Sequence, residues 1–162
     1  MPLFHNQNAV NQKLPDLDSF EITLKREDLL HPKVSGNKFR KLKYNLEKAK
    51  NEGYKTLLTF GGPFSNHLAA TAAAGSINGL KTIGVVRGEE VRERNPTLQF
   101  CQDHGMTLYP VTRKAYQQKE TAEFYQHLNQ KFGKFYCIPE GGTNELAVKG
   151  CGEILTKGDK SF

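Results

Sequence analysis

Hydrophobic positions follow two alternating patterns along the chain. Short apolar runs such as Thr56–Phe60 and Thr82–Val86 have the length and branched side chains of buried strands. Between such runs, apolar residues recur every three or four positions, as Leu42, Leu46 and Ala49 do, which is typical of one helix face. Strands that alternate with helices in this way predict βαβ units and a parallel sheet.

Capping and turn residues set the expected boundaries of these elements. Helices are expected from Lys38 towards Gly53, over 66–77 after the cap Ser65, over 96–104 after Asn95, over 113–131, and from Asn144 towards Leu155. Strands are expected over 20–25, 56–60, 82–86, 107–111 and 135–138, whereas the polar first 19 residues are expected to be irregular. The predicted fold class is α/β, an open parallel sheet flanked by helices.

The ends of two predicted strands carry glycine-rich loops. Gly61–Ser65 follows one strand and Glu140–Asn144 follows another. Ligands of open α/β sheets bind beyond the carboxyl ends of the strands. We therefore expect both loops to lie at one edge of the sheet and to share a site.

Composition narrows the class of protein. The 162 residues are 37% hydrophobic and 25% charged, and no apolar run approaches the roughly 20 residues of a membrane span. The first ten residues have no signal-peptide pattern, so a cytoplasmic protein is expected. The net charge of +6 is dispersed without a nucleic-acid-binding motif. Cys101, Cys137 and Cys151 form no CxxC pair, which favours reduced thiols over a zinc site or disulfides.

The segment Ser35–Lys41 places a lysine at the start of a predicted helix. The positive end of the helix dipole, partial burial and the nearby Lys41 would each lower the pKa of Lys38. An amine that deprotonates readily is suited to imine formation. From charge alone, a basic amphipathic helix with solvated lysines is the favoured interpretation.

The segment Gly61–His67 is a turn from a strand into a helix, where free N–H groups can bind a carboxylate or phosphate. Ser65 fits either a cap or a site residue, and His67 by itself fits a packed histidine. Ser65 and His67 diverge at a helix start and no Gly-x-Ser-x-Gly motif is present, which argues against acyl hydrolysis. No Gly-x-Gly-x-x-Gly follows any strand, which argues against dinucleotide binding.

In combination, these motifs are similar to those of one enzyme family. Leu24–Leu29, Ser35–Leu42, Gly61–His67 and Ile138–Asn144 resemble the 1-aminocyclopropane-1-carboxylate deaminase and D-cysteine desulfhydrase family of tryptophan-synthase-β-like (fold type II) pyridoxal-phosphate (PLP) enzymes. The resemblance covers the chain from Phe20 onward. It implies PLP as cofactor and a homodimer. It also implies a reaction that converts a small amino acid into a 2-oxo acid and ammonia, with sulfide from cysteine.

The resemblance also implies roles for individual residues. Lys38 would carry PLP as a Schiff base, next to Asn37 and supported by Lys41. Ser65 would contact the substrate as an acid or base. Asn66 would bind the phenolic oxygen of the cofactor, and Asn66 and His67 would line the substrate carboxylate site.

Family members are about twice as long as this chain. Residues 1–50 are expected to belong to the larger domain, 51–145 to form the small α/β domain, and 146–162 to begin a helix that leads to a C-terminal half. That half would supply the phosphate loop, so the chain alone is expected to be inactive or weakly active. Pro63–Phe64 replaces the expected aliphatic-Gln pair, which leaves the substrate open. A non-catalytic α/β binding or regulatory module is the alternative.

Overall fold

The computed structural model describes residues 3–4, 9–15, 20–88 and 95–161. Its centre is a four-stranded parallel sheet in the order β5-β4-β3-β6. The strands are β3 (Thr56–Gly61), β4 (Lys81–Arg87), β5 (Met106–Val111) and β6 (Tyr136–Cys137). The α/β class and the parallel sheet expected from the sequence are confirmed.

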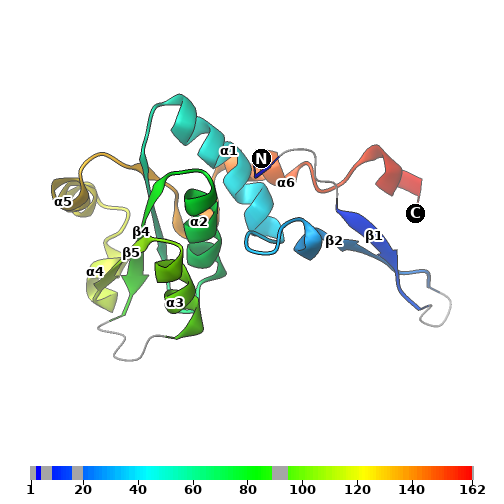
Figure 1. Cartoon of the computed structure of the whole chain (residues 1–162), viewed down its shortest axis with the longest axis horizontal. Coiled ribbons are helices and arrows are strands. Elements are labelled where there is room, and N and C mark those ends of the chain that lie inside the picture. Colours follow the sequence, from blue (N-terminus) through cyan, green and yellow to red (C-terminus); the bar gives the residue numbers. More distant parts are fainter. Residues whose placement is uncertain (1–2, 5–8, 16–19, 89–94, 162) are drawn as a thin grey trace.

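Helices cover both faces of this sheet (Figure 1). One face carries α1 (Asn37–Asn51), α2 (Asn66–Ile77) and α3 (Pro96–Asp103), and the other carries α4 (Arg113–Gln117) and α5 (Ala122–Phe132). The last helix, α6 (Glu145–Cys151), packs along α1. In the part of the chain that the structure describes, no helix is both long and apolar enough to cross a bilayer.

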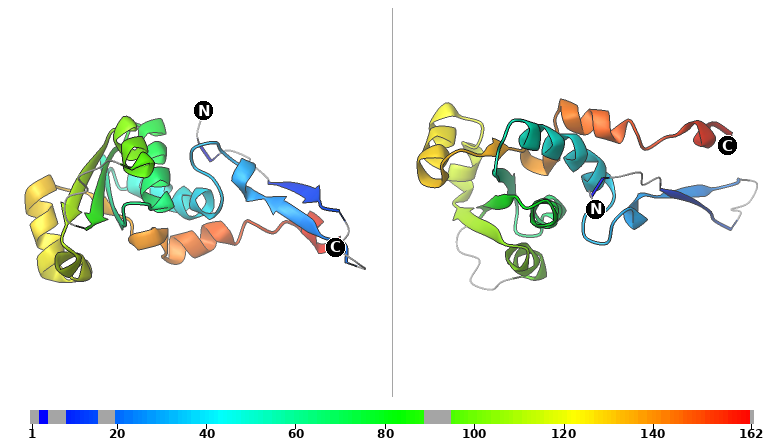
Figure 2. Two further views of the ribbon diagram at one scale, coloured as in Figure 1. Left: turned by 90° about the horizontal axis from the view of Figure 1, so that it is seen from below. Right: turned by 45° about the horizontal axis from the view of Figure 1, so that its top comes forward.

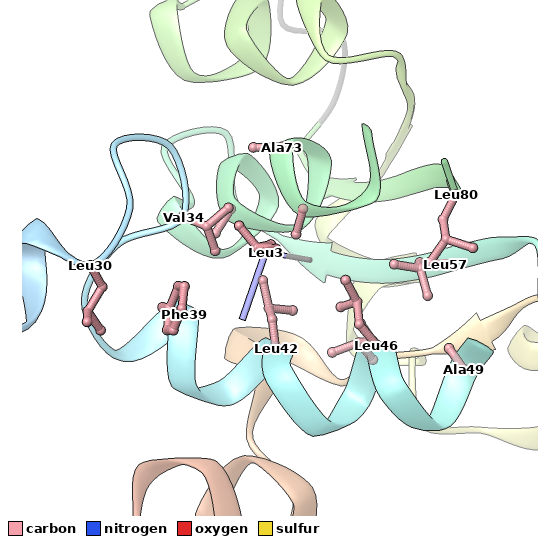
Figure 3. Close-up of a cluster of buried hydrophobic side chains, with 13 residues drawn as sticks. Leu3, Leu30, Val34, Phe39, Leu42, Leu46, Ala49, Leu57, Ala73 and Leu80 are labelled. Atoms are coloured by element: carbon pink, nitrogen blue, oxygen red, sulfur yellow. The ribbon is translucent and has the colours of Figure 1, made fainter. Parts of the chain in front are cut away.

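The core on the α1 side is formed by the apolar stripe that the sequence pattern predicted. Phe39, Leu42, Leu46 and Ala49 are buried on one face of α1 and point towards α2 and Leu57 of β3 (Figure 3). Burial of each large apolar side chain contributes about 1.5–3 kcal/mol. This stripe therefore fixes the rotation of α1, and with it the direction in which the lysines at its start point.

The opposite face has a separate aromatic core. Phe60 and Leu58 of β3 and Val85 of β4 pack against Tyr116 of α4 and Leu128 of α5. Neighbouring residues of β3 thus point to different cores, Leu57 to the first and Leu58 to the second, as the two-residue repeat of a strand requires.

An antiparallel hairpin projects from the sheet and its helices (Figure 2). It pairs β1 (Val10–Lys13) with β2 (Thr23–Arg26). The prediction of an irregular start is wrong for Val10–Lys13, because β1 is exposed along its whole length and carries no apolar alternation. Residues 1–2, 5–8 and 16–19 lie outside the described residues. The chain end returns beside the hairpin, where Asp159 binds Lys25 at 2.7 Å.

Four predicted elements differ in extent. The strand expected over 20–25 is β2, which runs from Thr23 to Arg26. The single helix over 113–131 is two helices, because Gln118 ends α4 and the hydroxyl of Thr121 accepts from the N–H of Phe124 to begin α5. The strand over 135–138 pairs only at Tyr136–Cys137. The last helix ends at Cys151 rather than near Leu155, followed by bends and a 3-10 turn at Lys157–Ser161. By contrast, α2 spans the predicted residues, with Ser65 as its cap.

Candidate active site

The two glycine-rich loops meet at the carboxyl edge of the sheet, as expected. Gly61–Ser65 follows β3 and Glu140–Asn144 follows β6, which is the neighbour of β3. β4 pairs with one side of β3, and β6, which follows β5 in the chain, pairs with the other side. These loops therefore flank the point where the strand order reverses. Such a point is the usual ligand site of an open parallel sheet.

An open cavity of about 570 Å³ lies between the starts of α1, α2 and α3. Its volume is within the range of about 300–1,000 Å³ that holds small ligands. Three of the predicted site residues line it, Asn37, Lys38 and Asn66, together with Gly36, whereas Lys41, Ser65 and His67 do not. The remaining lining comes from Pro32, Lys33, Ser35, Ala69, Ala70, Pro96, Thr97 and Phe100.

Lys38 is the second residue of α1 and is half-buried. Its Nζ donates a hydrogen bond of 3.0 Å to the carbonyl oxygen of Gly141. Burial lowers the pKa of the Lys38 amine, and the charge of Lys41 lowers it further. The expected direction of the pKa shift is therefore present, with burial as its largest cause.

Lys41 lies one turn after Lys38 and also reaches the loop after β6. Its Nζ donates to the Thr143 hydroxyl at 2.9 Å. The two lysines thus hold Gly141 and Thr143 from the same helix. Through these bonds the start of α1 and the Glu140–Asn144 loop form one unit.

His67 is buried beneath this unit, with 2% of its surface exposed. The Thr59 hydroxyl donates to the carbonyl of Ile138 at 2.8 Å and lies 2.9 Å from His67 Nε2. Because the hydroxyl has one proton, Nε2 must carry the imidazole proton and donate to it. Burial lowers the pKa of His67 to about 3, helped by the charges of Lys38 and Lys41, so the ring is neutral.

The other ring nitrogen of His67 faces Gly142. Nδ1 is buried without a hydrogen-bond partner among the described residues. A Cβ on Gly142 would lie 2.8 Å from His67 Cε1, and Gly142 also has φ +73°. Both the ring contact and the backbone conformation therefore require glycine at this position.

Ser65 and Asn66 begin α2. The Ser65 hydroxyl accepts a hydrogen bond from the N–H of Leu68 at 3.3 Å, so Ser65 is an N-cap. A Cβ on Gly61 would lie 2.7 Å from Ser65 Oγ, which explains the glycine there. Asn66 is exposed and lines the cavity, whereas the buried His67 does not. The first N–H groups of α2 have no acceptor within the helix and can bind an anion.

Sequence reasoning missed a buried ion pair behind Lys38. Arg40 is 4% exposed and donates twice to the Glu27 carboxylate, at 2.8 Å each. The backbone oxygen of Glu27 also accepts from the N–H of Gly36 at 2.9 Å. Glu27 therefore fixes both sides of the turn that leads to Lys38. Little in the sequence indicates this pair. Glu27 lies in the charged run Lys25–Asp28, which is too far from Arg40 along the chain for the two to be neighbours on one helix.

Comparisons with known proteins all relate this chain to pyridoxal-phosphate dependent enzymes and their relatives. The family model described as "Pyridoxal-phosphate dependent enzyme" matches residues 8–156. A Thermotoga maritima protein, provisionally named 1-aminocyclopropane-1-carboxylate deaminase, is 37% identical over 86% of this chain and 45% of its own length. An Arabidopsis thaliana protein named as a bifunctional mitochondrial D-cysteine desulfhydrase and 1-aminocyclopropane-1-carboxylate deaminase is 29% identical over 85% of the chain and 37% of its own length.

A solved structure gives the same relationship in three dimensions. The crystal structure of an ACC deaminase homologue superposes with a TM-score of 0.75 at 29% identity, over 94% of this chain and 49% of that one. The chain thus spans about half the length of the relatives it matches. It belongs to the family of pyridoxal-phosphate dependent enzymes, among relatives that include 1-aminocyclopropane-1-carboxylate deaminases and D-cysteine desulfhydrases.

Proposed function

We propose that this chain provides the cofactor lysine and the substrate-carboxylate side of a PLP-dependent enzyme. The whole enzyme would release ammonia from a small amino acid, 1-aminocyclopropane-1-carboxylate or D-cysteine, and leave a 2-oxo acid, with sulfide as well from D-cysteine. The observation that carries the proposal is the half-buried Lys38, which lines the cavity and whose amine is hydrogen-bonded to a neutral carbonyl. The names of the relatives supply the reaction.

The residues present fit PLP. Attachment needs a lysine that gives up its proton, and both burial and Lys41 lower the pKa of Lys38. The cavity beside it has the size of a cofactor site. When bound, PLP acts as an electron sink for negative charge that develops on the substrate carbon.

We assign the other residues as follows. Asn66, at the cavity wall, would bind the cofactor ring, with Asn37 beside the lysine. Ser65 and the first N–H groups of α2 would hold the substrate carboxylate, and Ser65 would exchange a proton with the substrate. Lys41 would lower the proton affinity of Lys38. His67 would act by holding the Gly141–Gly142 turn, since its ring is buried and points away from the cavity.

We also propose how the chain is divided into domains. Residues 1–50 would belong to a larger domain, 51–145 would form the small domain, and 146–162 would lead into the part that the relatives have in addition. Without the phosphate site that the resemblance assigns to that part, we expect little or no turnover by the chain alone. A homodimer, which the resemblance implies, and a cytoplasmic location remain predictions.

A partial reaction tests this function without requiring turnover. The purified protein is incubated with PLP, treated with borohydride with or without 1-aminocyclopropane-1-carboxylate or D-cysteine, and mapped for label on Lys38. The amine of a substrate is expected to free Nζ of Lys38 and so reduce its labelling. Cyclopropane carboxylate, which has no amine, is the control and should leave the labelling unchanged. Equal labelling with all compounds would contradict the proposed substrate class.

A further inference from the structure

A second cavity, of about 440 Å³, lies at the carboxyl edge of the sheet on the face covered by α4. It shares no lining residue with the cavity beside Lys38. Three strand ends contribute to it, because Arg87 ends β4, Arg113 lies just after β5 at the start of α4, and Glu140 follows β6. The described lining is Arg87, Arg113, Tyr116, Gln117, Lys119 and Glu140.

The charges around this cavity are mainly positive. Arg87, Arg113 and Lys119 carry three positive charges, and Glu140 is the one acidic side chain in the described lining. Lys119 Nζ lies 3.5 Å from a Glu140 carboxylate oxygen. That pair neutralises itself, which leaves the two guanidinium groups to attract an anion.

Tyr116 supplies a buried hydrogen-bond donor to the same cavity. Only 3% of its surface is exposed, and its ring packs edge-on against Phe60, with the centroids 6.2 Å apart. Arg87 lies 5.7 Å from the centroid of the Tyr116 ring and Lys119 lies 5.4 Å from it. The hydroxyl makes no hydrogen bond of ordinary geometry among the described residues, although the Glu140 carboxylate lies close enough to interact with it. A buried hydroxyl without a well-formed hydrogen bond is unfavourable, and a ligand that accepts from it would remove that cost.

The hydroxyl remains protonated and available as a donor. Burial raises the pKa of Tyr116, and the interaction of its hydroxyl with the Glu140 carboxylate, together with the negative charge there, raises it further. A protonated phenol and guanidinium groups are all donors, so the cavity offers donors to an acceptor-only ligand. An anion with planar oxygens matches the fork of an arginine.

We propose that this cavity is a binding site for a small monocarboxylate, held by Arg87 and Arg113 and by the hydroxyl of Tyr116. A phosphate dianion fits less well, because its second charge would lie beside the carboxylate of Glu140. The cavity also lies next to the Gly61–Ser65 loop. Arg87 Nη2 lies 3.5 Å from the position of a Cβ on Gly62, and the Gly62 carbonyl accepts from the N–H of Ser65. The proposal does not depend on the function proposed for Lys38.

The test is a titration of the ¹⁵N-labelled protein with acetate, at constant ionic strength set by chloride. Saturable shifts are expected in the amides around Arg87, Arg113 and Tyr116. The variant R113Q should weaken acetate binding at those amides at least tenfold. The matched control K114Q removes the same charge from the next residue of α4, which does not line the cavity, and should change binding less than twofold. Equal weakening by both variants would overturn the proposal.

A second variant isolates the hydroxyl. Y116F keeps the ring that packs on Phe60 and removes only the donor, so acetate binding should weaken about three- to tenfold while the chemical shifts of the core remain. Binding equal to that of the wild type would remove Tyr116 from the site. Inorganic phosphate is titrated in parallel, and tighter binding of phosphate than of acetate would overturn the assignment of a monocarboxylate.

Discussion

The Nζ of Lys38 donates to the carbonyl oxygen of Gly141 at 3.0 Å, although the two residues are 103 positions apart. A carbonyl oxygen orients the amine but does not neutralise it, and no carboxylate pairs with Lys38 in the described residues. A carboxylate partner would raise the pKa of the amine. The contact with Gly141 therefore holds Lys38 in place without cancelling the effect of burial.

The Gly141–Gly142 turn, whose Gly141 carbonyl binds Lys38, requires glycine at position 142. In G142A, the new Cβ would approach His67 Cε1 to 2.8 Å, and alanine would also have to adopt φ +73°. We expect a loss of about 2–4 kcal/mol in the free energy of unfolding, from the strained backbone together with displacement of a buried ring. Urea denaturation measures this loss.

G79A is the matched control for that variant. Gly79 has a similar φ of +66°, but a Cβ there meets nothing within 4 Å. The backbone strain alone should cost about 1 kcal/mol. If the two variants lost equal stability, the contact between Gly142 and His67 would not contribute.

Burial of the neutral His67 ring should make the free energy of unfolding depend on pH. Its pKa is about 3 in the folded protein against 6.5 for an ordinary histidine, so between these values the unfolded chain binds the extra proton. Stability from this group is complete above about pH 6.5 and falls as the pH drops towards 3, by up to about 4–5 kcal/mol. Unfolding by urea at several pH values measures the slope.

Replacement of the ring removes this titration. H67Q should be less stable at pH 7 and should lose much of the decline between pH 6.5 and 4. H127Q is the control, because His127 is exposed and its removal should leave the decline in place. A decline in H67Q as steep as in the wild type would assign the pH dependence to other groups.

The ion pair behind Lys38 should be a major source of stability. E27Q removes the two 2.8 Å hydrogen bonds of the buried Arg40 to a carboxylate and leaves only its longer contact with Glu153 at 3.7 Å, which should cost about 3–5 kcal/mol. E21Q removes a carboxylate from the exposed pair with Lys13 and should cost less than about 1 kcal/mol. Denaturation of both variants at one pH gives the comparison, and similar losses would mean that Glu27 does not fix the turn before Lys38.

The sequence was most informative where local chemistry decides the structure. The two ends of α2 were predicted from Ser65 and Asn78-Gly79. The buried face of α1 was predicted from the stripe Leu42, Leu46 and Ala49. The parallel order of the strands then brought the two glycine-rich loops together. The resemblance assigned Lys38, Asn37 and Asn66 to one site, and all three line the cavity at the starts of α1 and α2.

The features that were missed depend on contacts between distant segments. β1 is exposed and has no apolar alternation, so its pairing with β2 leaves no pattern in the sequence. The pairing of Glu27 with Arg40 needs the turn between them, whose shape follows from tertiary packing. The protonation of His67 follows from Thr59 and the Ile138 carbonyl, which only the fold brings together.

The central claim is that Lys38 is the cofactor lysine, and reductive trapping tests it most directly. The purified protein is mixed with PLP at neutral pH, its absorbance near ~420 nm is recorded, and borohydride treatment is followed by peptide mapping. The account predicts the absorbance band and a label concentrated on Lys38. K38A should lose both, while K33A, which removes a lysine from the same cavity, should retain them. Label spread over many lysines, or a band that persists in K38A, would contradict the account.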